Sequence, residues 1–192
     1  MKVLFLALLF AAGASAQTPG TVSDGPCSVD SMRPDNNPKA LTIELSIPAP
    51  VHQVWEAFTT QQGLSSWLAP DVSVALKPGG DWLVMFPGST GGGTILSFTP
   101  EKEIVINALA PDRFPHVRAA RTHAVFTFIA EGNTTRVRLT QTGWQIGAEW
   151  DAAYEYLAAG NAELLAMLHH RFVAGPTDWQ KVMASDADKS AK

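Results

Sequence analysis

The side chain that most directly suggests a binding site is an amide on the apolar face of a long helical segment. A buried amide without a hydrogen-bond partner costs roughly 1 to 3 kcal/mol, so Asn161 requires a partner. Two partners remain open: a ligand or water in a cavity, and a side chain of a facing sheet such as Gln141. The neighbouring Gly160 predicts a close approach to the sheet or a kink, because glycine costs about 1 kcal/mol relative to alanine inside a helix. At 100° per residue, the apolar band is about 100° wide and contains Trp150, Tyr154, Leu157, Asn161, Leu164, Leu165, Leu168 and Phe172.

A second chemical group is a cluster of basic residues in the segment 111–121, namely Arg113, His116, Arg118 and Arg121. If this segment borders a cavity, His116, Arg118 and Arg121 form a rim that binds the carboxylate or phosphate of a ligand whose tail enters the interior. The alternative is an ordinary solvated loop.

No catalytic or metal-binding motif is evident. The chain has no Gly-x-Ser-x-Gly elbow, and its five histidines show no H-x-x-x-H spacing. His169 and His170 are adjacent, so on a helix they point about 100° apart. The sequence therefore predicts no metal and no cofactor. An enzymatic alternative would use Asn161, His123 or Tyr154 for positioning or proton transfer.

These side chains need a sheet and a helix to position them. Alternating apolar residues predict a first strand over 43–47, and the spacing of residues 51–58 predicts an amphipathic helix that Gly63 ends. A second helical turn, four strand-like runs and a hairpin over 123–142 follow. The long helix over 150–172 comes last. Strands grouped between two helical segments favour an α+β domain with an antiparallel sheet.

The ends of the chain differ from the domain between them. Lys2, an apolar run over 3–12 and the small residues 14–16 predict a signal peptide over 1–16, cleaved after Ala16. Residues 17–38 predict a flexible leader, residues 39–179 the domain, and residues 180–192 a disordered tail. Cys27 has no second cysteine with which to form an internal disulfide.

The net charge and the predicted signal peptide limit where the protein is located and which partners it can bind. The net charge of −4 becomes −5 without Lys2, which disfavours nucleic acid. No later segment is long and apolar enough to span a bilayer. We therefore expect an exported protein, periplasmic or extracellular, without stable membrane insertion.

Five sequence segments, in this order, resemble the START and Bet v 1-like helix-grip superfamily (SRPBCC). They are PVHQVWEAFT (50–59), LSSWLAP (64–70), PGGDW (78–82), FTPEKEIV (98–105) and TRVRLTQTGW (135–144). Within the superfamily, the chain is similar to the branch of the activator of the heat-shock-protein-ninety ATPase. The resemblance implies a curved antiparallel sheet of six to seven strands wrapped around the C-terminal helix, two short helices after the first strand, and a hydrophobic cavity between sheet and helix.

The function that we expect is non-catalytic binding of a small lipid-like or aromatic molecule in this cavity. An enzyme that acts on such a molecule and a protein-interaction module are the alternatives. A cytosolic chaperone partner does not fit the predicted signal peptide. The expected ligand-binding residues are Trp67, Trp82, Phe126, Gln141, Tyr154, Leu157, Asn161 and Leu164.

Overall fold

The computed structural model describes residues 28–30, 39–86 and 89–190. The expected signal peptide, its cleavage site after Ala16, Cys27 and most of the expected leader lie outside the described residues. No helix in the described part of the chain has the length and apolar character needed to cross a membrane.

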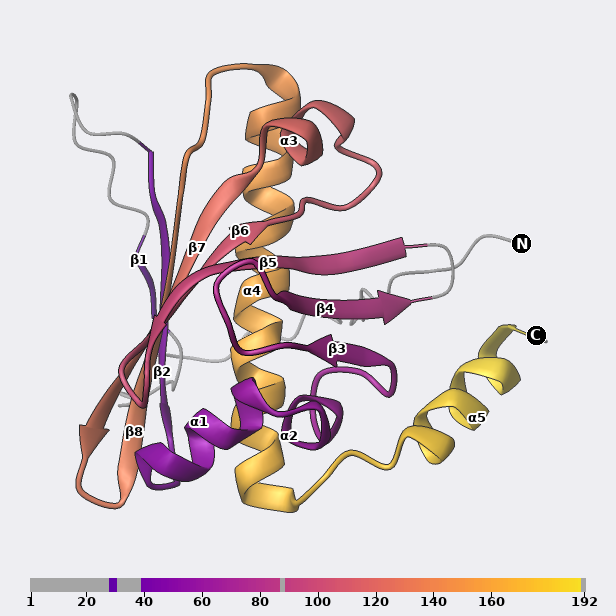
Figure 1. Cartoon of the computed structure of the whole chain (residues 1–192). Coiled ribbons are helices and arrows are strands. Elements are labelled where there is room, and N and C mark those ends of the chain that lie inside the picture. Colours follow the sequence, from indigo (N-terminus) through magenta and orange to yellow (C-terminus); the bar gives the residue numbers. More distant parts are fainter. Residues whose placement is uncertain (1–27, 31–38, 87–88, 191–192) are drawn as a thin grey trace, which may run out of the picture.

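One antiparallel sheet contains all the strands that the structure describes. Its order is β1-β2-β8-β7-β6-β5-β4-β3, so β2 and β8, which are far apart in the sequence, lie side by side. Figure 1 shows how the sheet curves around helix α4: β2 and β8 run along the helix, whereas β4 and β5 cross it. The strands are β1 (Ser28–Asp30), β2 (Leu41–Ile47), β3 (Val72–Val74), β4 (Asp81–Phe86), β5 (Ser89–Thr99), β6 (Glu103–Ala108), β7 (Thr122–Glu131) and β8 (Thr134–Thr142).

The strands β2 to β8 confirm the predicted antiparallel sheet, and β1 adds an eighth strand. Residues 28–30 pair with β2 inside the segment that the sequence predicts as a flexible leader, so the prediction is wrong at these three residues. The outer edge of β2 offers unpaired backbone N–H and C=O groups, and a short segment can pair with them without any apolar periodicity.

Two short helices follow β2, as predicted, but their boundary differs from the prediction. Helix α1 (Val51–Thr59) ends before Thr60, whose hydroxyl accepts a hydrogen bond from the Gly63 N–H at 2.9 Å and so caps α2 (Gln61–Ser65). Gly63 therefore lies inside the second helix and does not end the first. A Cβ atom at this position would overlap the Glu56 carbonyl oxygen, so the close contact between α1 and α2 requires glycine.

The long helix α4 (Ala148–Ala174) lies on the inner face of the sheet and packs most extensively against β2. The inner face is apolar because alternate strand residues point toward α4. On β2 these residues are Leu41, Ile43, Leu45 and Ile47, all of which are buried. The predicted grip of the sheet on the C-terminal helix is confirmed.

A further helix, α5 (Trp179–Ser190), occupies most of the predicted disordered tail, which corrects that prediction. The Asp178 carboxylate accepts a hydrogen bond from the Lys181 N–H at 3.1 Å and so caps the helix. The Trp179 indole donates to the Ser65 carbonyl at 2.6 Å, and the Thr177 N–H donates to the Ser66 carbonyl at 2.8 Å. Contacts to the C-terminal end of α2 hold the start of this segment, and the local sequence pattern does not reveal them.

Candidate functional site

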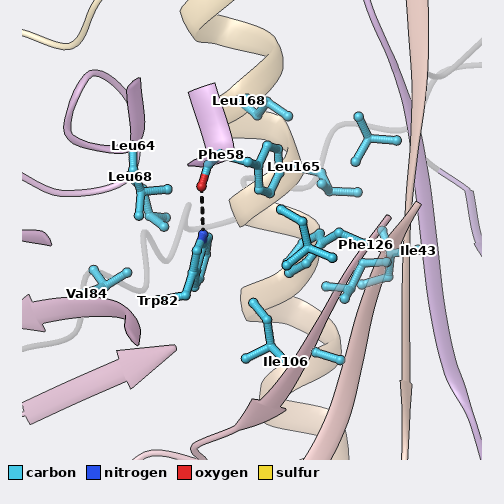
Figure 2. Packing of buried hydrophobic residues seen from close by; sticks show 14 of the residues in the cluster. Ile43, Phe58, Leu64, Leu68, Trp82, Val84, Ile106, Phe126, Leu165 and Leu168 are labelled. Carbon is cyan, nitrogen blue, oxygen red and sulfur yellow. Dashed lines mark hydrogen bonds between the residues drawn. The ribbon is translucent and has the colours of Figure 1, made fainter. Parts of the chain in front are cut away.

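Three of the predicted site residues, Trp67, Trp82 and Phe126, form part of an aromatic cluster around Phe58. The Phe58 ring centroid lies 5.2 Å from that of Trp67, 6.3 Å from that of Trp82 and 5.0 Å from that of Phe126. The Trp82 indole donates a 2.9 Å hydrogen bond to the Phe58 carbonyl, and the two groups face each other in Figure 2. The Trp67 indole likewise donates to the Ala57 carbonyl at 2.9 Å. The polar atoms of both tryptophans therefore have partners, and the cluster forms a fixed wall at one end of the space between sheet and α4.

Asn161 and Gln141 lie together at the centre of the same interface. The Asn161 side-chain N–H donates to Gln141 Oε1 at 2.9 Å, which is the internal hydrogen bond that the sequence left as one of two alternatives. The Gln141 amide then donates to the Thr122 hydroxyl at 2.7 Å. Helix α4, strand β8 and strand β7 each supply one member of this chain of polar side chains, which we call the polar triad.

Sequence analysis missed Thr122, although it is the most deeply buried member of the triad. Its exposed fraction is 1 %, against 4 % for Gln141, while Asn161 is half-buried. The signal was present in β7, where Thr122, Ala124, Phe126 and Phe128 alternate as inner-face residues. A threonine in that series points toward the helix, and its hydroxyl requires a hydrogen bond there.

Two separate stretches of α4 are buried, and the residues between them are less so. Trp150, Ala153 and Tyr154 are buried near the start of the helix, and Leu165 and Leu168 are buried beyond its centre. Between these two stretches, the residues that pack against the core are only partly buried, and they include the predicted site residues Leu157 and Leu164. This partly buried set consists of Tyr156, Leu157, Ala158, Asn161, Ala162 and Leu164.

Small residues lie beside the triad within the sheet. Gly93 pairs with Ala108, and Ala108 pairs with Thr122, so the three residues form one row across β5, β6 and β7. Ala124 pairs with Gln141 in the next row. Paired residues of an antiparallel sheet share a face, so Ala108 lies beside Thr122 and Ala124 beside Gln141, while Leu41 flanks Gln141 on its other side.

Tyr154 lies nearer the start of α4 and anchors the helix to β2. Its hydroxyl donates to the Ala40 carbonyl at 3.1 Å, and its ring centroid lies 5.0 Å from that of Trp144. The Lys39 ammonium lies 4.1 Å from the centroid of the same ring and forms a 2.8 Å ion pair with Asp151. The geometry gives Tyr154 a structural role at the end of the sheet where β2 begins.

The segment that carries the predicted cationic rim contains a helix, α3 (Pro115–Ala120), where the sequence predicts an irregular link. The Glu149 carboxylate, in the first turn of α4, accepts hydrogen bonds from the backbone N–H groups of His116 at 2.8 Å and Val117 at 3.1 Å. It therefore caps α3 from a distant element, which local sequence reasoning does not detect. The His116 imidazole Nδ1 lies 2.5 Å from the second carboxylate oxygen.

The pKa values of this region follow from these contacts. The His116 hydrogen bond lowers the pKa of Glu149 below its usual 4.5, and the backbone N–H groups of Val117 and His116 act in the same direction, whereas burial opposes them. Burial raises the pKa of the Tyr156 phenol, an effect that the nearby Arg113 cation partly offsets.

Two arginines of this segment, Arg113 and Arg118, contact other groups of the protein. The Arg118 guanidinium donates to the carbonyls of Thr90 and Ala110, and it forms a 2.9 Å ion pair with Asp112. Arg113 lies over the ring of Tyr156 with 4.8 Å between the guanidinium carbon and the ring centroid. Arg121 follows α3 with φ 66° and ψ 157°, a backbone conformation that glycine adopts far more readily.

Two further residues that the sequence singled out lie away from the interface. Gly160 is exposed, and a Cβ atom at this position would meet nothing within 4 Å, so the expected close approach to the sheet is wrong. His123 is exposed on the outer face of β7. Among the described residues, no group of three or more His, Cys, Asp or Glu side chains is placed to hold a metal ion.

Comparison with known proteins identifies the family of this chain. The sequence pattern of the family described as activator of Hsp90 ATPase homolog 1-like protein matches residues 48–172. The chain belongs to this family. The match runs from the end of β2 to the last turn of α4, so it includes the aromatic cluster and the polar triad.

Solved structures support the same assignment at the level of the fold. The Aha1 dimer from Colwellia psychrerythraea is 22 % identical with a TM-score of 0.60, and the similarity covers 71 % of this chain and 97 % of that one. CalU16 from Micromonospora echinospora is 18 % identical with a TM-score of 0.56, with 86 % and 92 % coverage. No curated protein matches the chain significantly. The activator-like fold, which the sequence resemblance predicted, is thus confirmed.

Proposed function

We propose that this activator-like protein binds a small apolar molecule between the inner face of the sheet and α4, as a carrier or sensor without a reaction of its own. The observation that carries the proposal is the contrast in burial along α4. Ala153 and Tyr154 on one side and Leu165 and Leu168 on the other are buried, whereas Leu157, Ala158 and Ala162 between them are partly exposed.

Physical reasoning favours an apolar occupant for this region. Burying apolar surface contributes roughly 25 cal/mol per Å², and partly exposed leucine and alanine side chains gain this contribution when an apolar molecule covers them. Ligand sites of this kind are mostly apolar, with a few polar groups that orient the ligand. The polar triad supplies such groups among apolar neighbours.

A pair of phenylalanine substitutions one residue apart tests the proposal. Ala158 faces the interface and is partly buried, whereas Ala159 is exposed on the same helix. Ala158→Phe should fill the space and abolish uptake of the neutral fluorophore N-phenyl-1-naphthylamine, while Ala159→Phe should bind it like the wild type. Equal binding by both variants, or no uptake by the wild-type protein, would overturn the proposal.

We also propose that the protein is exported and that its partner is therefore not a cytosolic chaperone. The support is the N-terminal sequence, with Lys2, the apolar run and the small residues up to Ala16. Expression of the full chain in a bacterial host, followed by cell fractionation and N-terminal sequencing, should yield a protein that begins at Gln17 outside the cytoplasm. Retention of an intact Met1 form in the cytoplasm would refute export.

A further inference from the structure

In the polar triad each hydrogen bond is donated from the helix side toward the sheet, so the first residue keeps an acceptor and the last keeps a donor. Asn161 donates to Gln141, and Gln141 donates to the Thr122 hydroxyl oxygen. Among the hydrogen bonds of the described residues, the Thr122 hydroxyl makes none as a donor, and Asn161 Oδ1 makes none as an acceptor. The triad thus retains one donor on the sheet and one acceptor on the helix.

The two ends differ in access. Thr122 is 1 % exposed, so its hydroxyl proton lies within the interface. Asn161 Oδ1 is not one of the buried unpaired atoms of the described residues, since that set contains only Arg136 Nε. The Asn161 oxygen, which accepts no hydrogen bond among the described residues, is therefore not fully buried.

The buried polar side chains near this point are uncharged. Of the buried polar residues that the structure describes, Thr122 and Gln141 belong to the triad, and the third, Thr135, donates its hydroxyl to the Ala49 carbonyl at 2.8 Å. Two of the three candidate rim cations are engaged elsewhere, since Arg118 binds two carbonyls and Asp112, and His116 binds Glu149. A carboxylate placed among these uncharged side chains would lose its hydration, and neither Arg118 nor His116 is free to compensate its charge.

We infer that the ligand is a neutral, largely apolar molecule with one hydroxyl group, and that the polar triad recognises this group. A hydroxyl donates to Asn161 Oδ1, and its own oxygen accepts a hydrogen bond, so it suits a site that offers both functions. The apolar remainder covers Leu157, Ala158 and Ala162. This inference rests on the proposed function, because it identifies the chemical class of the molecule in the same site.

Three aromatic probes of the same ring size separate the possibilities at neutral pH: 2-naphthol, naphthalene and 2-naphthoate. One additional hydrogen bond to a neutral group contributes about 1 to 1.5 kcal/mol, or roughly a tenfold difference in Kd. Wild-type protein should therefore bind 2-naphthol about tenfold more tightly than naphthalene and should bind 2-naphthoate most weakly. Displacement of N-phenyl-1-naphthylamine measures all three affinities.

Two variants assign the preference to the triad. Asn161→Leu removes the acceptor, and Thr122→Val replaces a hydroxyl with a methyl group of similar size. Each variant should retain naphthalene binding and lose most of the preference for 2-naphthol. Gly160→Ala, adjacent to Asn161 but exposed, is the matched control and should keep the preference. Circular dichroism checks that each variant is folded.

The outcomes separate this inference from the proposed function. If the wild type binds naphthalene as tightly as 2-naphthol, prefers 2-naphthoate, or keeps its preference in both triad variants, the inference is wrong and the proposal of an apolar ligand stands. If the wild-type protein binds none of the three probes and does not take up N-phenyl-1-naphthylamine, both the inference and the proposed function are wrong.

Discussion

The hydrogen bond between Asn161 and Gln141 allows a quantitative test of the interface in the protein without ligand. Asn161→Leu removes the donor to Gln141 Oε1, which then lies in an interface where Gln141 is 4 % exposed. Leaving a buried acceptor unpaired costs about 1 to 3 kcal/mol. Because the activator-like domain is of a size at which 1 kcal/mol lowers Tm by about 2 to 4 °C, a loss of about 2 kcal/mol corresponds to roughly 4 to 8 °C.

The double variant is more informative than either single one. Gln141→Leu leaves the Asn161 amide without its partner, but Asn161 is half-buried and water can replace the lost hydrogen bond in part. Replacing both residues with leucine removes the donor and the acceptor together. We therefore expect the double variant to be less destabilised than the sum of the single variants, with a coupling free energy of about 1 to 2 kcal/mol.

Urea denaturation followed by tryptophan fluorescence gives the four free energies of unfolding that the cycle requires, and the six tryptophans provide the signal. Asn107→Leu is the control, since this residue is half-buried on β6 and its side chain makes no hydrogen bond among the described residues. It should change the free energy of unfolding by less than about 0.5 kcal/mol. Single-variant effects that add to within about 0.5 kcal/mol would refute the pairing and the role of the triad with it.

Two glycine substitutions and one acidic variant extend the test to other parts of the fold. Gly160→Ala should raise the free energy of unfolding by about 1 kcal/mol, because the position is helical and open, and a lower Tm would contradict this placement. Gly63→Ala should instead lower Tm despite its helical position, because the new Cβ overlaps the Glu56 carbonyl oxygen; an unchanged Tm would show that α1 and α2 are less closely packed. The pKa of Glu149 is lower in the folded protein than in the unfolded chain, where it is about 4.5, so the ionised carboxylate stabilises the fold at pH values above 4.5. This stabilisation is lost as the pH falls through the pKa of the folded state, and amide exchange in α3 should therefore accelerate below pH 4.5. Glu149→Gln should remove much of this pH dependence, and an acid response equal to that of the wild type would assign the effect to other groups.

The fold was predictable because its signals are local. The alternation of Ile43, Leu45 and Ile47 and the helical spacing of Val51, Val54 and Phe58 require only a few consecutive residues to be recognised. The order of these segments then limits the topology to an antiparallel sheet with a terminal helix. The same local reasoning identified the amide of Asn161 as needing a partner and included Gln141 among the candidates.

The incorrect predictions concern contacts between distant segments. The tail near Trp179 shows little apolar periodicity, yet Ser65 and Ser66 accept its hydrogen bonds. Residues 28–30 pair with β2 through backbone atoms alone. The Glu149 cap on α3 joins residues more than thirty positions apart. None of these interactions has a periodic signature, because each depends on which element lies opposite.

The candidate site likewise has features that the sequence predicts and features that only the tertiary structure determines. The apolar stripe of α4, the presence of one amide in it and the aromatic residues that face it are properties of the amino-acid order, because periodicity assigns each residue to a face. Strand register selects Thr122 as the third member of the triad, and side-chain packing determines that Gly160 is exposed and that the middle of α4 is only partly buried. These features depend on the relative positions of several strands and a helix, which long-range packing sets and no single segment encodes.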